Sequence, residues 1–466
     1  RRPPRSTLFP YTTLFRSLGN EDLVRAHVYA VWLAKTGLPL GNSIAEVIET
    51  DLLPELPLKE EVWAQIELAE LRLAECLEEA REILATCGSD LADSGWYADE
   101  WLQDLLRNAP RAFEAAFERW RELYRAAMVQ LLNAQQTFYR SRRREEQEET
   151  KRLMEEANRQ RNLLVNETKA EESDFNPYRY LASGGFLPGY NFPRLPLRAF
   201  IPRGEGEYIA RPRFLALTEF GPHNIIYHNG AKYTVKGFIF PPGGLEQRQR
   251  KVKLCQVCGC FHGDATTDLC SHCNTRLDAN TSEVAVLLDM PNVRTRRRER
   301  ITCDEEERIR RGYRVTTHFR FAPAPGGQER RISAVAYDEA GNPLLRLVYG
   351  PSATLYRINH GWRHRPPREH FSVEFDRGDI WGSVPEGEEP EEWPGEARAE
   401  RKVLRLAVWN TENLLLVYLL DPAWQGNEDF LATLQYALQR GMENVFEVEE
   451  TELASERLGS GAFRAL

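Results

Sequence analysis

The chain has 466 residues, of which 42% are hydrophobic and 28% are charged, and its formal net charge is −9. This length is sufficient for two to four domains with packed cores, and no apolar run approaches the roughly 20 residues that span a bilayer. The acidic balance excludes a protein that coats nucleic acid with its whole surface, although it is compatible with a local basic patch. We therefore expect a soluble protein without a membrane partner.

Both ends of the chain have unusual sequences. The start, RRPPRSTLFPYTTLFRS, resembles translated sequencing-adapter DNA, so residues 1–17 are expected to be non-native and are left out of the fold predictions. The end, SERLGSGAFRAL, stops without a capped final element. These two features predict a fragment of a longer protein.

Residues 18–140 predict a helical domain. Apolar residues recur at helical spacing in three stretches, 21–36, 60–87 and 111–140. In the third stretch the recurring residues are Phe113, Phe117, Trp120, Leu123, Tyr124, Ala127 and Leu131. An aromatic stripe of this kind is typical of the buried face of a helix.

Composition changes twice in the middle of the chain. Residues 141–173 are nearly all polar and of mixed charge, which predicts a solvated linker helix. From Asp174 onward Pro, Gly and aromatic residues are frequent, and short β-like runs predominate up to residue 382. The stretches HNGAKY and DEAGNP contain the Asn-Gly and Gly-Asn pairs of β-hairpin turns. The segment 174–382 is therefore expected to be a β-rich domain.

The last part of the chain combines a loop with a mixed unit. Residues 383–400, SVPEGEEPEEWPGEARAE, predict an acidic and mobile loop. Residues 401–466 predict a truncated α/β part, with two buried strands, an amphipathic helix broken at Gly441 and a final strand. The fold class expected for the whole chain is thus α+β, with a helical region, a β-rich domain and a late strand-helix-strand unit.

The strongest local motif is CQVCGCFHGDATTDLCSHC at residues 255–273. Two Cys-x-x-Cys pairs are separated by eleven residues, and each such pair can bring two thiolates onto one metal ion. The predicted ligands are Cys255, Cys258, Cys270 and Cys273. Four thiolates without an open position predict a structural zinc site, with iron as the main alternative. Paired cysteines in a long chain also favour a reducing compartment, and hence the cytoplasm.

The same loop offers other ligands. Further candidates there are Cys260, His262 and His272, and the carboxylates of Asp264 and Asp268 are close in sequence. Cys260 can replace Cys258, although the spacing of the first pair mirrors that of the second. A catalytic zinc requires three protein ligands, an open position and a nearby base, so the fourth cysteine argues against catalysis.

A basic stretch follows the cysteine motif. The predicted DNA-backbone contacts are Arg294, Arg296, Arg297 and Arg298, which are expected on a loop that follows a buried strand and lies beside the metal site. Arginine suits this role because its planar guanidinium can donate two hydrogen bonds to one phosphate. Further along, the aromatic ring of Trp362 can stack on a base, and the neighbouring Arg363 supplies a cation.

Both basic stretches have an alternative interpretation. The arginines can instead pair with the acidic residues at 304–307 in a solvated loop, and Trp362 can belong to a core with charged residues around it. Nucleotide-binding and hydrolase motifs are not found: the sequence contains no G-x-x-x-x-G-K-[ST], H-E-x-x-H, G-x-S-x-G or G-x-G-x-x-G. The chain alone is therefore not expected to hydrolyse ATP.

Several stretches are similar to one known family. SDFNPYRYLASGGFLPGYNFPRLPLRAFIP, ARPRFLALTEFGPHNIIYHNGAKYTVKGF, the four cysteines and TLQYALQRGMENVF resemble the C-terminal region of large DEAD/DEAH-box helicase-like proteins of superfamily 2. Within that family the resemblance points to the helicase subunit of the bacterial DISARM anti-phage system. It covers residues 20–466, and FLPGYNFPR and the cysteine segment are its most specific parts. The glycine-rich segment that often follows the last helix in this family is not seen in this chain.

This resemblance implies an accessory portion of an ATP-dependent DNA motor. ATP would bind only to the motor, which is expected upstream of this chain, and other defence-system subunits are possible partners. The resemblance places the four cysteines of the family at Cys255, Cys258, Cys270 and Cys273. It also implies a structural and DNA-handling role for the domain around them. The alternative hypothesis is a stand-alone, zinc-stabilised scaffold that binds a protein partner through its helical arm, and a hydrolytic metalloenzyme is a weaker third.

Overall fold

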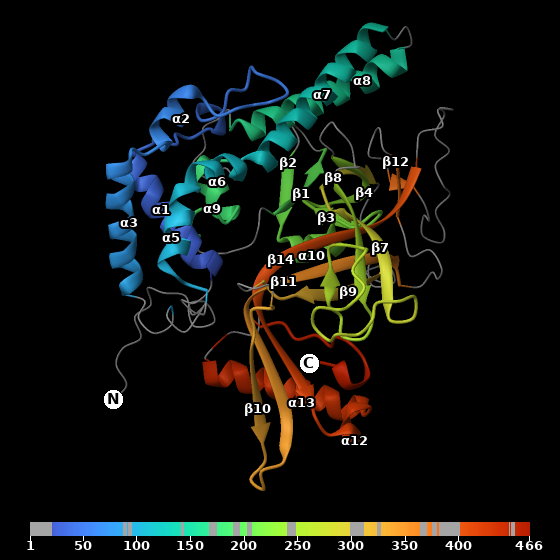
Figure 1. The fold of residues 1–466 in the computed structure, drawn as a ribbon. Helices are drawn as coiled ribbons and strands as arrows, with labels where there is room; N and C mark the ends of the chain where they lie inside the picture. The colour runs from blue at the N-terminus through green and yellow to red at the C-terminus, as the bar shows by residue number, and fades with distance from the viewer. Residues whose placement is uncertain are drawn as a thin grey trace, which may run out of the picture.

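The computed structural model describes residues 21–86, 91, 96–140, 144–166, 175–189, 196–202, 207–239, 248–298, 312–323, 328–363, 371–374, 380–381, 401–446, 448 and 453–466. The segments 1–17 and 383–400, for which adapter-derived sequence and a mobile acidic loop are predicted, lie outside these residues. Helices occupy the first part of the described chain and strands most of the second, which confirms the α+β class (Figure 1). None of the described helices combines the length and the apolar character that a membrane crossing requires.

The helical region has one shared core. Its helices are α1 (Glu21–Thr36), η2 (Ile44–Glu46), α2 (Glu60–Ile66), α3 (Glu70–Ala85), α5 (Asp99–Arg107), α6 (Ala109–Ala116), α7 (Glu118–Arg140), α8 (Arg144–Leu164) and α9 (Pro177–Ser183). Trp32, Phe113 and Trp120 are fully buried where the apolar faces meet. Phe117 packs against Phe113 and Tyr180, with ring centroids 5.1 Å and 5.9 Å away. The predicted aromatic stripe is therefore a core face.

Two of the predicted helices are interrupted. The stretch 60–87 divides into α2 and α3 because Glu67 is extended, with ψ at 90°. The stretch 111–140 divides at Phe117, which ends α6 while its carbonyl accepts a hydrogen bond from the backbone N–H of Arg121 in α7. The helical periodicity did not predict these breaks because apolar residues continue across both of them.

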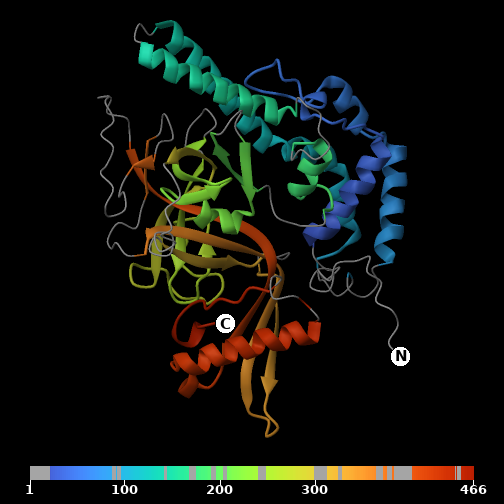
Figure 2. The ribbon, with the colours of Figure 1, turned by 180° about the vertical axis from the view of Figure 1, so that it is seen from behind.

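The charged helix predicted within 141–173 is α8, which packs against α7. The pair forms an arm whose tip extends beyond the β-rich region (Figures 1 and 2). Among the side chains of α8 that the structure describes, the buried ones are those of Thr150, Ala157, Gln160 and Leu164. Because these positions recur at helical spacing, one face of this highly charged helix is used for packing.

A five-stranded sheet begins the β-rich region. Its strand order is β2-β1-β8-β4-β3, with β1 (Leu197–Ile201), β2 (Glu207–Arg211), β3 (Ile225–His228), β4 (Ala231–Ile239) and β8 (Asn292–Arg298). Asn229 and Gly230, at φ 47° and 73°, form the predicted hairpin turn between β3 and β4. The helix α10 (Arg213–Glu219) contacts β1 of this sheet and two strands of the second sheet, β11 and β14, and so joins the two.

The second sheet has nine strands in the order β10-β11-β14-β7-β5-β6, with β9 paired to β11, β12 to β14 and β13 to β12. Their bounds are β5 (Gln249–Cys255), β6 (Phe261–His262), β7 (Ser282–Asp289), β9 (Tyr313–Arg320), β10 (Ile332–Tyr337), β11 (Pro343–Trp362), β12 (Phe371–Glu374), β13 (Ile380–Trp381) and β14 (Arg401–Leu419). Since β14 pairs with β11 and β7, the sheet runs from the predicted β-rich domain into the predicted C-terminal part.

The C-terminal part differs from its prediction in detail. The two strands expected there are one continuous strand, β14, because its middle stays paired with the long strand β11. After α12 (Pro422–Gln425), the helix α13 (Glu428–Phe446) continues through Gly441 without the predicted break. Beyond α13, residues 448 and 453–466 contain the short helix η4 (Gly461–Phe463) and isolated bridges, such as Tyr418 to Ala465, whereas the strand predicted directly after the helix falls mainly on residues 447 and 449–452, outside the described residues.

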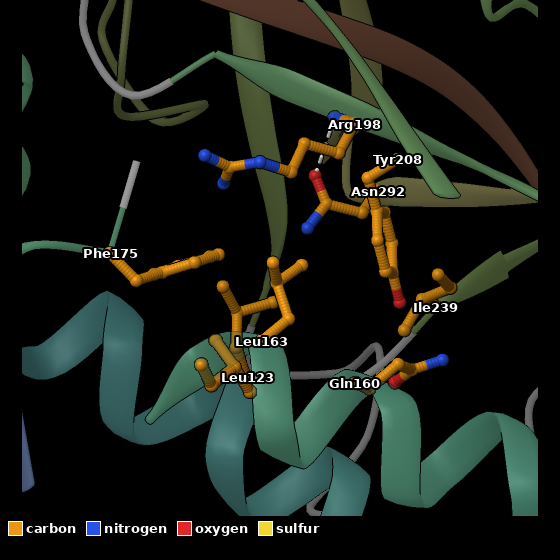
Figure 3. Close-up of a pocket in the computed structure, with 9 residues that line it drawn as sticks. Leu123, Gln160, Leu163, Phe175, Arg198, Tyr208, Ile239 and Asn292 are labelled. Carbon is orange, nitrogen blue, oxygen red and sulfur yellow. Dashed lines mark hydrogen bonds between the residues drawn. The ribbon is translucent and has the colours of Figure 1, made fainter. Parts of the chain in front are cut away.

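The arm meets the five-stranded sheet at a small cavity (Figure 3). Leu123 and Leu163 line it from the arm, and Arg198 and Asn292 line it from the sheet. The Arg198 guanidinium lies 4.3 Å from the centroid of the Phe175 ring, and its backbone N–H donates to Asn292 Oδ1 at 2.9 Å. With a volume of about 20 Å³, the cavity can hold about one water molecule. This seam is therefore a packed joint between the two regions.

Candidate metal centre

The four predicted cysteine ligands converge on one point. Cys255 and Cys258 lie at the end of β5, whereas Cys270 and Cys273 lie in the connection between β6 and β7. Their four Sγ atoms lie within 4.8 Å of one another. The Sγ atoms of Cys255 and Cys273 are 3.8 Å apart, and those of Cys258 and Cys270 are 3.6 Å apart. Three of the side chains are buried and that of Cys273 is half-buried.

The two Cys-x-x-Cys turns have the same backbone hydrogen bonds, and we call them the first knuckle (255–260) and the second knuckle (270–275). In each one, the residue after the second cysteine, Gly259 or Asn274, donates its N–H to the carbonyl of the first cysteine at 3.0 Å. The N–H of the first cysteine donates to the carbonyl five residues further on, at 3.0 Å and 2.9 Å. Both turns therefore close on themselves and present two thiols on one side.

Residue type explains why both turns can form. Gly259 has φ at 83° and Asn274 has φ at 57°, which is the left-handed region. Glycine reaches this region without a steric penalty, and asparagine tolerates it better than most residues. The Gly and Asn that follow the two pairs are therefore a second sequence signal for the knuckles, which the spacing of the cysteines alone does not include.

The arrangement fits a tetrahedral metal ion. With metal–sulfur bonds of about 2.3 Å, the sulfur atoms of a tetrahedral site lie about 3.8 Å apart, and the two sulfur pairs described above match this separation. The thiols affect one another's pKa values. The contact with Cys255 is the largest cause of the raised pKa of Cys258, and other neighbouring thiols add to it. The contact with Cys255 is also the largest cause of the lowered pKa of Cys270. Four thiolates at this distance require a cation to neutralise them. Zinc and iron both satisfy this donor set.

The surroundings favour a structural rather than a hydrolytic centre. The carboxylate of Asp264 accepts hydrogen bonds from the N–H and the hydroxyl of Thr266, and the first of these lowers its pKa. Asp268 is exposed. Both carboxylates are thus exposed to solvent. The four sulfur atoms of the described centre leave no open position for water.

A buried chain of polar side chains supports the first knuckle. His318 Nδ1 lies 3.2 Å from the Gly259 carbonyl oxygen and therefore donates to it. Its Nε2 then accepts from the hydroxyl of Thr316 at 3.2 Å, and that oxygen accepts from Nε2 of His360 at 2.7 Å. Burial lowers the pKa of both imidazoles to about 4, so both are neutral at pH 7.

The final segment of the described chain also packs on the first knuckle. The backbone N–H of Ser460 donates to the carbonyl of Val257 at 2.8 Å. Gly459, with φ at 72°, approaches so closely that a Cβ there would lie 2.8 Å from the same carbonyl oxygen. Residues of β9, β14 and this segment thus enclose the sulfur atoms in one apolar cluster.

An ionic network supports the second knuckle. His272, an alternative ligand in the sequence, has its Nε2 2.7 Å from the hydroxyl of Tyr418. Its Nδ1 lies 2.9 Å from Arg331 and 3.2 Å from Glu329, and Glu329 also accepts from the hydroxyl of Ser271. Burial raises the pKa of Glu329, but the hydrogen bond with His272 and nearby charges outweigh it and lower the pKa overall. His272 therefore holds the knuckle from outside the ligand set.

The predicted arginine contacts are on a strand and not on a loop. Arg294, Arg296, Arg297 and Arg298 all belong to β8, which pairs with β1 and β4. Arg294 is half-buried, while Arg296 and Arg297 are exposed. The expectation that these arginines lie beside the metal centre also needs correction. The strand β8 is in the five-stranded sheet, whereas the knuckles adjoin the nine-stranded sheet. Long-range pairing of β8 causes both differences.

The second predicted contact lies at the end of β11. Trp362 is half-buried and stacks on Tyr313, with ring centroids 4.5 Å apart and an interplanar angle of 24°. It also packs against the apolar cluster between the two sheets. Arg363 is exposed, and its backbone N–H donates to the Gly312 carbonyl. This packing favours the interpretation in which Trp362 belongs to the core.

Comparison of the chain with models of protein families, with curated proteins and with solved structures finds no match. The likeness to helicase-like proteins rests on the quoted stretches of sequence. The geometry of the sulfur centre and the placement of the basic residues therefore carry the functional argument.

Proposed function

We propose that the chain is an accessory C-terminal portion of an ATP-dependent DNA helicase or translocase, in which one zinc ion stabilises the β-rich region and arginines of β8 contact the DNA backbone. A role in anti-phage defence, together with other defence subunits, is part of the proposal through the sequence resemblance. ATP would be bound and hydrolysed by the upstream motor.

The closed sulfur centre is the observation that carries this proposal. Four cysteines from two separate turns surround one point, and three of them are buried. A site of this kind contributes folding energy and performs no chemistry on a substrate. An accessory, structural role follows more directly from such a centre than a catalytic one.

The arginines supply the second part of the argument. Strand alternation directs Arg294 and Arg296 to one side of β8 and Arg297 to the other. Arg296 and Arg297 are exposed near the end of the strand. Such a group can bind phosphates on a DNA strand, and phosphate contacts give affinity without sequence preference.

Binding of the purified chain to DNA duplexes of unrelated sequence tests this proposal. We expect non-specific binding that weakens steeply with salt, and a slope against log salt that decreases by up to about 4 units when Arg294, Arg296, Arg297 and Arg298 are all replaced by Ala. A matched control replaces four exposed arginines of the helical region, namely Arg72, Arg107, Arg111 and Arg140. The proposal fails if both variants bind with the affinity and slope of the unmodified chain.

An exposed apolar surface favours the scaffold alternative. β10 is an edge strand of the nine-stranded sheet, and large apolar side chains are exposed on it and on α13. They include Ile332, Val335, Tyr337, Tyr436, Val445 and Phe446. Exposed apolar groups on an edge strand often mark protein interfaces. Under this alternative the zinc-stabilised region would bind a protein partner, and the four-arginine variant would not differ from the unmodified chain in any DNA assay.

A further inference from the structure

A second group of metal-binding side chains adjoins the four-cysteine centre. The Sγ atoms of Cys260 and Cys270 and a ring nitrogen of His262 lie within 4.8 Å of one another. All three side chains are buried, with His262 only 6% exposed. Because Cys270 belongs to both groups, the two groups share one sulfur atom.

Strand geometry holds the two additional residues in place. His262 belongs to β6 and pairs with Lys253 of β5, and Cys260 forms a bridge with Phe319 of β9. Since side chains alternate along extended chain, Cys260 and His262 point to one side and Phe261 to the other. Phe261 stacks on Tyr356 with ring centroids 3.6 Å apart, which fixes this orientation.

We propose that Cys260, His262 and Cys270 bind a second thiophilic divalent cation, of which Zn²⁺ is the natural candidate, and that the Cys270 thiolate bridges the two metal ions. Two sulfur atoms and one imidazole form a common zinc donor set. The site would be three-coordinate in protein atoms, with the fourth position left for a water molecule or for the hydroxyl of Ser271, which lies 3.7 Å from Cys260 Sγ.

The present partners of these side chains are incomplete. His262 Nε2 is buried and has no hydrogen-bond partner among the described residues. The Cys260 sulfur adjoins the thiols of Cys258 and Cys270, and its other contacts, to Ser271 and to the carbonyl oxygen of Phe261, are long, at 3.7 Å and 4.0 Å. Buried polar atoms normally have partners, and a metal ion bound through His262 Nε2 would supply one to both residues.

Charge also favours a second cation. One zinc ion with four thiolates has a net charge of about −2, whereas two zinc ions with five thiolates and one neutral imidazole have a net charge of about −1. Less net charge is then buried, which lowers the desolvation cost. Binding requires that Cys260 lose its thiol proton to solvent, so loading of the second site should release protons.

Metal analysis of the purified chain at increasing free Zn²⁺ tests the proposal. We expect two metal ions per chain at saturation, decreasing to one in the Cys260→Ser and His262→Gln variants, which leave the four-cysteine centre intact. Cys76→Ala is the matched control, because Cys76 is a buried cysteine of the helical core, and this variant should retain two. Circular dichroism establishes that each variant is folded.

Loading with cadmium-113 then separates a bridged pair from two independent sites. NMR of the cadmium protein should show two resonances that couple to each other through the shared thiolate, and the Cys260→Ser variant should lose one of them. A saturating stoichiometry of one or fewer overturns the proposal. It is overturned equally by two ions whose binding does not change in either variant, or by two uncoupled resonances.

Discussion

The two knuckles share one backbone geometry but differ in what holds them. The first is supported by uncharged groups, namely the chain of His318, Thr316 and His360 and the segment that contains Gly459. The second is supported by a network that contains ions, through Glu329 and Arg331. The metal ligands are thus symmetric and local, whereas their surroundings are asymmetric and come from distant parts of the chain.

This difference separates two sources of stability in one small centre. Metal binding depends equally on both knuckles, because each supplies two of the four ligands. Packing and hydrogen bonding act on one knuckle at a time. Substitutions of ligands should therefore have large and similar effects on both sides, while substitutions of supporting groups should have smaller and one-sided effects.

Loss of a ligand tests the symmetric part and should have the largest effect. We expect Cys258→Ser and Cys273→Ser each to abolish metal binding at the four-cysteine centre and to destabilise the β-rich region by several kcal/mol, since the free energy of structural zinc binding is about 10–16 kcal/mol and is largely folding free energy. Zinc content and hydrogen exchange across residues 249–289 measure this. Cys76→Ala, in the helical core, should keep its zinc. A variant that loses protection in only its own knuckle would show that the two turns fold independently.

Crowding at Gly459 tests the support of the first knuckle alone. An alanine Cβ there would lie 2.4 Å from the Phe463 carbonyl oxygen and 2.8 Å from that of Val257. We expect Gly459→Ala to cost about 2–4 kcal/mol of unfolding free energy, because overpacking adds to the cost of a left-handed residue. The measurement is denaturant unfolding of the zinc-loaded chain.

Gly461→Ala is the matched control for this substitution. Gly461 also has positive φ, at 55°, but its Cβ would meet nothing within 4 Å. It should therefore cost only the conformational part, about 1–2 kcal/mol. Equal losses in the two variants would mean that the final segment contributes little to the first knuckle.

The ligands could be predicted from the sequence because the information for them is local. Two pairs of cysteines with the right spacing, each followed by a residue that tolerates positive φ, specify both turns. The supporting groups could not be predicted in the same way. His318 lies 59 residues from Gly259, and Tyr418 lies 146 residues from His272. Only the pairing of the strands brings these residues to the centre.

The arginine run failed as a prediction of local structure for a related reason. Charge density predicted a loop, but Val293 and Thr295 alternate with Arg294 and Arg296 and are buried between β1 and β4. The Thr295 hydroxyl donates to the Phe200 carbonyl at 2.7 Å. Period-two alternation was present in the sequence, and it outweighs charge when both neighbouring strands are supplied by distant segments. By contrast, the helical core was predictable because its aromatic stripe is periodic within one stretch.

Acidification provides the smallest test, and it acts on the two knuckles in different pH ranges. The pKa of His360 is lowered to about 4, first by burial, from an ordinary value near 6.5. The unfolded chain therefore binds a proton below about pH 6.5 that the folded chain does not, and stability falls as the pH decreases from about 6.5 toward 4. The lowered pKa of Glu329 affects the free energy of unfolding at more acidic pH, because this carboxylate keeps its stabilising charge until the pH falls below the usual pKa of a glutamate.

Between pH 7 and pH 5.5, the support of the first knuckle should therefore weaken. We expect His360→Gln, which can still donate to Thr316 but cannot titrate, to remove about 1 kcal/mol of the decrease in unfolding free energy over this interval. His27→Gln is the control, since His27 is an exposed histidine of α1. Protonation of the zinc ligands affects all three proteins alike, so it cancels in the differences between their pH profiles. If His360→Gln follows the same profile as the unmodified chain, His360 is not a source of the pH dependence.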